Sequence, residues 1–218
     1  MKVKWHKWLP YVFMLLTALS RWPGLFPSNF SALYGLAFCA GAFFPGRMKW
    51  WLPFGTLLVS DVCLDFYYLH KGYNVFDIPL LKYQCFNYVA FAVLVFLGRC
   101  FSRRSSLLSL LSGGLLGAIL FYLITNTASW LFNPFNNPEY TKDLQGWIRA
   151  LTLGTAGWPE TWQFFRNTLM SGGLFTGLFA GAMKLTSSAE SAEEKEPKEA
   201  PEADAEPETE PAPQGTKS

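Results

Sequence analysis

The chain has 218 residues, enough for one domain, and its 18 Lys/Arg against 16 Asp/Glu leave a formal net charge of +2. Half of the residues are hydrophobic, and 20 Phe, 9 Trp and 9 Tyr are more aromatics than a soluble core needs. Basic residues stand singly between apolar runs rather than in a stripe, which excludes a nucleic-acid interface. The four cysteines have no CxxC spacing, so we expect no metal site, redox site or cofactor.

Six apolar segments predict an all-α fold, a polytopic membrane bundle of six transmembrane helices. In chain order they are residues 8–20, 30–44, 50–69, 79–101, 107–132 and 162–185. The joints are marked by prolines, which disfavour a continuing helix, and these are Pro23, Pro27, Pro45 and Pro134. Between the last two segments, the polar loop 133–159 contains Trp147, Ile148, Leu151 and Leu153, which predicts a short interfacial or re-entrant helix.

The first segment has a second interpretation, as a cleaved signal peptide. Lys2, Lys4 and Lys7 precede its apolar run, and residues 18–20 resemble a signal-peptidase site. The tryptophans that flank the segment favour a retained interfacial anchor, because Trp concentrates where lipid meets water.

Two regions of opposite charge divide the chain. Residues 1–185 carry a net charge of +9, and we assign them to the six-helix transmembrane domain. Residues 186–218 are rich in Glu, Pro and Ala with a net charge of −7, which predicts a disordered acidic tail. Nine basic residues fall in the segments on the side of the N-terminus and five on the other side, so the positive-inside rule places both termini in the cytoplasm. We expect a multi-pass protein of the bacterial cytoplasmic (inner) membrane.

Polar residues in the predicted helices gather at one depth, in the outer half of the bilayer. Asp61 and Asp65 are four residues apart and share one face of the third helix. Because such groups are costly in lipid, we expect an outer cavity that binds a small polar ligand. Its candidate residues are Asn29, Asp61, Asn87, Asn126, Trp130, Arg166 and Asn167. Asn29 has an alternative role as a helix cap, and Arg166 as a side chain that extends to the water interface.

Arg166 is the basic residue that we expect to pair with Asp61. It is the one basic residue predicted inside a membrane helix in the outer half. An ionised Asp61 without a partner would cost several kcal/mol at that depth.

Small residues repeat every four positions in the inner halves of the helices. Ala37 and Gly41 do so on the second helix, and Gly173, Gly177 and Gly181 on the sixth. Such stripes let helix backbones approach closely, either within the chain or at a docking face for another membrane subunit.

Enzyme functions find no support in the motifs. The spacing Asp61-x-x-x-Asp65 occurs in phospholipid-head-group transferases, but the upstream elements of that signature are missing. The chain has no Walker loop, HExxH or GxSxG. A transport role would therefore take its energy from a partner or an ion gradient.

The membrane body, residues 8–185, resembles a family of uncharacterised bacterial membrane proteins. The matching stretches are residues 27–31 (PSNFS), 60–61 (SD), 123–126 (LITN) through Trp130, and 164–169 (FFRNTL). Its six-helix layout is similar to the substrate-capture (S) components of energy-coupling factor vitamin transporters. That resemblance implies a ligand entering from outside, a transmembrane coupling subunit docked on small residues, and ATPase subunits.

The leading hypothesis is therefore the substrate-binding membrane component of an uptake transporter for a small molecule such as a vitamin or its precursor. The alternative is a non-catalytic structural subunit of a cell-envelope assembly, in which the polar cluster fastens the bundle. Retention of a small molecule by the purified protein distinguishes the two.

Overall fold

A computed structural model describes residues 8–193, and within them it contains seven helices and no strand, which confirms the all-α class. The helices, in chain order, are α1 (Leu9–Ser20), α2 (Leu33–Phe43), α3 (Met48–His70), α4 (Ile78–Gly98), α5 (Leu107–Phe132), α6 (Leu144–Leu151) and α7 (Thr161–Glu193).

Each of the six predicted segments corresponds to one helix. The additional helix, α6, lies in the loop where a short helix was expected. Helix α7 continues through residues 186–193, which the charge pattern had assigned to the tail. The remainder of the predicted tail and the basic N-terminal flank lie outside the described residues.

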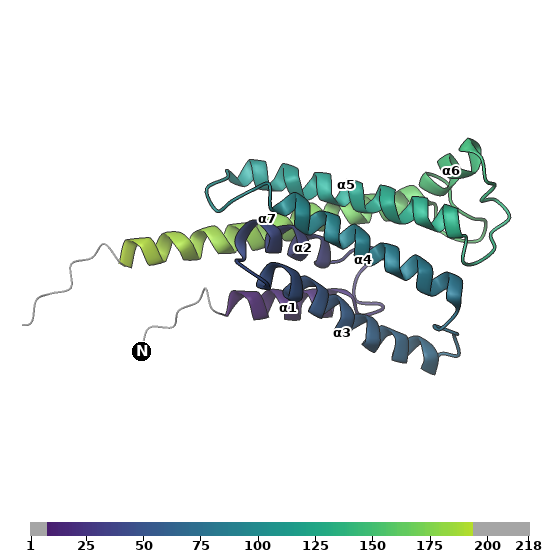
Figure 1. The fold of residues 1–218 in the computed structure, drawn as a ribbon, viewed down its shortest axis with the longest axis horizontal. Helices are drawn as coiled ribbons and strands as arrows, with labels where there is room; N and C mark the ends of the chain where they lie inside the picture. Colours follow the sequence, from purple (N-terminus) through teal and green to yellow (C-terminus); the bar gives the residue numbers. More distant parts are fainter. Residues whose placement is uncertain (1–7, 194–218) are drawn as a thin grey trace, which may run out of the picture.

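Three helices, α3, α4 and α5, are long and apolar enough to cross a membrane. Helices α1 and α2 have 12 and 11 residues, which is about 18 and 17 Å at 1.5 Å per residue. A hydrocarbon core is about 30 Å thick, so neither helix crosses it alone. Instead the two form a hairpin, and its turn lies short of the far ends of α3, α4 and α5 (Figure 1).

The short helix α2 is the centre of the bundle. It contacts α1, α3, α4, α5 and α7, and every residue from Ala32 to Ala40 is buried. Glycines bring its backbone against two neighbours: a Cβ on Gly41 or Gly98 would overlap backbone of the facing helix, and one on Gly35 would meet the α7 backbone at Phe175. Such contacts supply van der Waals packing where lipid removes the hydrophobic drive between helices.

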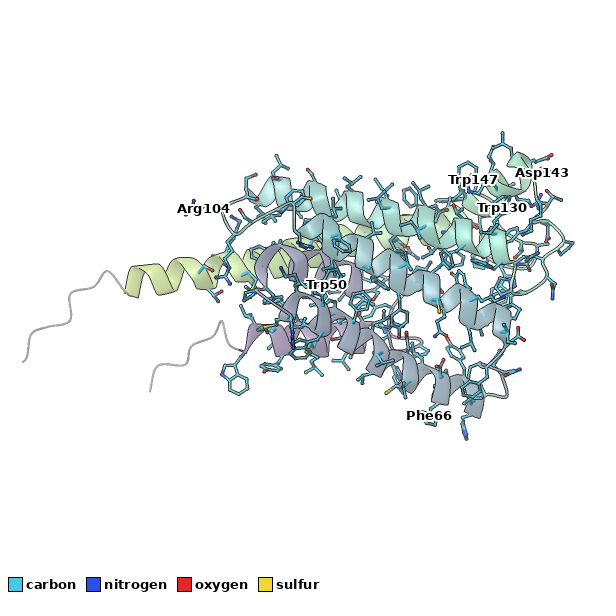
Figure 2. All side chains as sticks on the ribbon, viewed as in Figure 1. Trp50, Phe66, Arg104, Trp130, Asp143 and Trp147 are labelled. Atoms are coloured by element: carbon cyan, nitrogen blue, oxygen red, sulfur yellow. The ribbon has the colours of Figure 1, made fainter. Side chains whose placement is uncertain are left out.

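Large apolar side chains cover the outside of the bundle, and its apolar core also encloses hydroxyl groups. Buried side chains include the hydroxyls of Thr17, Thr56 and Thr176, whereas large apolar side chains are exposed along the long helices. Phe66, 68 % exposed, points away from the bundle (Figure 2). Water would disfavour this distribution, and a bilayer accommodates it. The exposed surface of α3, α4 and α5 therefore indicates a membrane protein.

The two ends of the bundle differ in character. The start of α1 and the end of α7 lie at one end (Figure 1), where Arg104 is also found (Figure 2). We call this the basic end, and its described residues are Arg47, Lys49, Arg99, Arg103, Arg104 and Lys184. The opposite end carries α6 with Trp147, Trp130 and Asp143, and we call it the cap end (Figure 2).

The α2–α4 crossing generates the first prediction. Gly98→Ala places a methyl group against the Phe38 carbonyl oxygen, and neither backbone can move easily. We expect a loss of about 1–3 kcal/mol, as for other overpacked cores, measured by thermal unfolding in mild detergent. Gly181→Ala is the matched control, because its Cβ would meet no atom within 4 Å. Equal stability of the two variants would contradict the close crossing.

Candidate ligand-binding site at the turn of the α1–α2 hairpin

Asp61 of α3 is the buried carboxylate of this site, and two other elements hold it. Its Oδ1 forms an ion pair with Nη2 of Arg21, the residue that ends α1. Its Oδ2 accepts a hydrogen bond of 2.8 Å from the hydroxyl of Tyr88 on α4. The side chains of Arg21 and Asp61 are 17 % and 10 % exposed, so the pair is largely shielded.

Helix lengths explain why Arg21 meets Asp61. Both α1 and α3 begin near the basic end (Figure 1). Asp61 lies about 20 Å along α3, and α1 ends after about 18 Å, at 1.5 Å per residue. Arg21 also follows the carbonyl groups that end α1, where a cation complements the helix dipole. The early end of α1 thus places a guanidinium at the depth of the carboxylate.

Two serine hydroxyls of the hairpin turn accept hydrogen bonds from its backbone. Ser20 Oγ accepts from the N–H of Ala32 at 2.9 Å, which links the end of α1 to the start of α2. Ser31 Oγ accepts from the N–H of Leu33 at 3.2 Å. Irregular backbone at membrane depth is stable only where such partners or water satisfy it.

Asn29 and Asn167 belong to the same turn. Asn29 adopts a left-handed conformation, with φ of 60°, and its carbonyl oxygen accepts from the Tyr34 hydroxyl at 3.3 Å. Asn167 of α7 donates through Nδ2 to the Ser28 carbonyl oxygen at 3.0 Å. Ala32 is the N-cap residue of α2, and Ser31 accepts from the first N–H of the helix, so the alternative interpretation of Asn29 as its cap is wrong.

The predicted pairing of Asp61 with Arg166 is also wrong. Arg166 is exposed on α7, and its guanidinium lies over the ring of Trp162, 5.8 Å from the centroid. The prediction had placed Arg21 in the outer loop because it treated α1 as a complete span. Because α1 ends well before α3 does, the residue that follows it, Arg21, lies beside Asp61 inside the bundle.

The other candidate residues have separate environments. The Asn126 side chain donates to the Tyr122 carbonyl oxygen of its own helix at 2.9 Å. Trp130 donates through Nε1 to the Thr141 carbonyl oxygen at 2.6 Å, and Lys142 lies over its ring at the cap end. Asn87 is half-buried on α4, immediately before Tyr88. Asn126 and Trp130 therefore bond to groups of α5 and of the loop that follows it, and neither is bonded to the hairpin turn.

The small-residue stripes pack helices within the chain. Ala37 is fully buried, and Gly41 faces Val95 and Gly98 of α4. On α7, a Cβ at Gly173 or Gly177 would meet a leucine of α5, at 3.2 Å in each case. Only the last residue of the α7 stripe, Gly181, faces open space in the described structure. These contacts favour the first interpretation of the stripes, packing within the chain, and the docking face for another subunit stays a prediction.

The residues between α5 and α7 at the cap end, which we call the cap loop, include two carboxylates outside the membrane-spanning segments. The backbone N–H of Ala156 donates to Glu139 and is the main cause that lowers the pKa of this carboxyl below its ordinary value. The N–H of Gly146 does the same for the pKa of Asp143, which caps α6. Both side chains are thus acceptors that order the loop, and neither contacts the Arg21–Asp61 pair.

The charges at the hairpin turn do not cancel. Arg21 and Asp61 neutralise each other, whereas Asp65, one helical turn nearer the cap end, forms no ion pair with a described residue. Arg21 retains a buried Nε without a hydrogen-bond partner among the described groups. The site therefore combines a carboxyl group without an ion pair, that of Asp65, with an N–H donor of Arg21 that has no described partner.

A double-mutant cycle tests the pair. Asp61→Asn alone should cost about 3 kcal/mol, near the lower end for buried pairs because Arg21 keeps some exposure. Combining it with Arg21→Gln should recover about 1–3 kcal/mol of coupling energy. The matched combination with Arg166→Gln should be additive within about 0.5 kcal/mol. Coupling to Arg166 and not to Arg21, measured by denaturation in detergent, would refute the assignment.

Comparison with known proteins places the chain in a family without assigning an activity. No curated protein and no solved structure matches it. A model of the family of unknown function DUF6580 matches residues 1–195, which include all the helices described above. Because the match covers most of the chain, this protein belongs to the DUF6580 family.

Proposed function

We propose that this chain is the substrate-binding component of a small-molecule uptake system, with its ligand site at the Arg21–Asp61 pair. The observation that carries the proposal is a largely buried charged pair held by the turn of a helical hairpin in a bundle of apolar helices. Ionisable residues inside a membrane are costly, and they commonly mark a ligand or ion pathway. Interrupted helices build such sites in many transporters.

The charges indicate which ligands fit. Asp65 adds a second carboxylate beside a pair that is already neutral, so a ligand with a cationic group would balance the site. Aromatic rings surround this region, with Trp22 edge-on to Tyr67 at 5.8 Å and Phe54 beside Tyr88 at 6.2 Å. Such rings provide apolar walls and attract cations. We therefore propose a small organic cation or an amine as the ligand class.

Energy for uptake would come from partner subunits. A transmembrane coupling subunit with ATPase subunits is the arrangement that the layout resemblance implies. Because the small-residue stripes are mostly used within the chain, this partner would need a different surface of the bundle.

A structural role in an envelope assembly is the second candidate. It is favoured by the fact that both carboxylate oxygens of Asp61 already have partners in the chain. In that case the pair only fastens the hairpin to α3 and α4, and the protein binds no small molecule.

Ligand retention separates the two functions. The full-length protein, purified from native membranes in mild detergent, should carry a small molecule that native mass spectrometry detects. Asp65→Asn leaves the ion pair intact and should weaken retention about tenfold, or about 1.4 kcal/mol. The control, Asp77→Asn, changes an exposed acid and should retain the ligand. An empty wild-type protein with normal stability would favour the structural role.

Orientation in the bilayer follows from the two ends of the bundle. The basic end should face the cytoplasm and the cap end the outside of a bacterial inner membrane. We propose four membrane-crossing helices, α3, α4, α5 and α7, with the α1–α2 hairpin entering from the cytoplasmic side. This arrangement keeps both termini in the cytoplasm with fewer complete spans than the six that the sequence predicts.

Reporter tags test this orientation. A tag after Ser218 should be accessible only from the cytoplasm, and a tag inserted after the exposed Asn136 should be accessible from outside. Labelling of intact cells with a membrane-impermeant reagent measures both. External labelling of the C-terminal tag would overturn the proposed orientation.

A further inference from the structure

Helix α6 is packed along the side of α5. The indole of Trp147 donates to Thr127 Oγ1 at 2.9 Å, and Thr127 precedes the end of α5 at Phe132 by five residues. That is about 7–8 Å below the helix end. Figure 1 shows α6 beside the cap end of α5. The helix thus lies at the depth of the last turns of a membrane-spanning segment.

One face of α6 holds it against the bundle. Ala150 is fully buried. Gly146 packs so tightly against Thr141, in the loop just before α6, that a Cβ would overlap the Thr141 backbone. Asp143 fixes the start of the helix by accepting from the Gly146 N–H at 2.7 Å. These contacts determine how the helix is rotated about its axis.

This rotation leaves further apolar side chains uncovered. Leu144 and Ile148, four residues apart on one face, are 67 % and 48 % exposed. The polar residue Gln145 is exposed on the remaining arc. The apolar arc of α6 is therefore wider than the part that the bundle covers.

Exposed apolar side chains also occur on the elements next to α6. Leu123 and Leu131 of α5, the helix against which α6 packs, are large apolar residues that are also exposed. After α6, Trp158 is 75 % exposed, and Trp162 at the start of α7 is also exposed. Exposed tryptophans at the end of a bundle are typical of the membrane–water interface.

We infer that α6 is an interfacial helix whose Leu144 and Ile148 insert into the lipid leaflet at the cap end. Its eight residues are far too short to span a bilayer. At the interface, it buries its apolar arc partly in the bundle and partly in acyl chains. The polar arc then faces the head groups and water.

Site-directed spin labelling in vesicles tests this inference. The full chain would carry Cys63→Ser, Cys85→Ser and Cys100→Ser, whereas Cys39 is buried and can remain. Single cysteines at Leu144, Ile148 or Gln145 are labelled with a nitroxide after reconstitution into phosphatidylethanolamine–phosphatidylglycerol vesicles. All three positions are exposed, and normal thermal unfolding of each labelled protein confirms its fold.

Collision rates with oxygen, which concentrates in lipid, and with a water-soluble nickel chelate give the environment of each label. Labels at Leu144 and Ile148 should have an oxygen-to-nickel ratio several-fold above that at Gln145, close to a label at the exposed Leu131 near the cap end of α5. Nickel access at both positions would place the face in water. Protection from both reagents would mean that a second copy or another protein covers it. Either result overturns the inference.

Discussion

The mismatch between a twelve-residue helix and a hydrocarbon core of about 30 Å is the constraint on which the site depends. Because α1 is much shorter than α3, its end must satisfy free backbone groups inside the bundle and place the next residue, Arg21, at the level of Asp61. The Ser20 hydroxyl accepts from the backbone N–H of Ala32, and the Asp61 carboxylate on α3 pairs with Arg21. The ion pair thus follows from the hairpin, and Arg21 is the residue through which the hairpin meets α3.

Close backbone packing makes a central hairpin possible. The eleven-residue helix α2 buries large side chains such as Phe38, and its glycines Gly35 and Gly41, with Gly98 of α4, also bring its backbone close to its neighbours. In lipid this close approach is favourable, since dispersion contacts between backbones do not depend on water. Further large apolar residues lie on the outer surface, where lipid can solvate them. On α6, likewise, apolar side chains remain exposed, because its apolar arc exceeds what the bundle covers.

Much of the fold could be predicted from the sequence, because apolar runs, prolines and charge bias are local signals. The segments 50–69, 79–101 and 107–132 correspond to α3, α4 and α5, and the short helix in the cap loop was expected from Trp147 and Ile148. The thirteen-residue run 8–20 already carried a signal against a complete span, namely its length. Reading that length strictly would have moved Arg21 from an outer loop to the depth of Asp61.

The residues alone indicate a helical membrane protein, a buried Asp61 that needs a partner, and small residues that bring helices together. These inferences follow from the apolar segments, from the cost of polar groups in lipid and from the size of a side chain. The assembled fold was needed to show that the partner is Arg21, since the sequence pointed to Arg166. It likewise assigned the glycine stripes to contacts within the chain. Pairing and packing depend on which helix faces meet, and no local pattern encodes that.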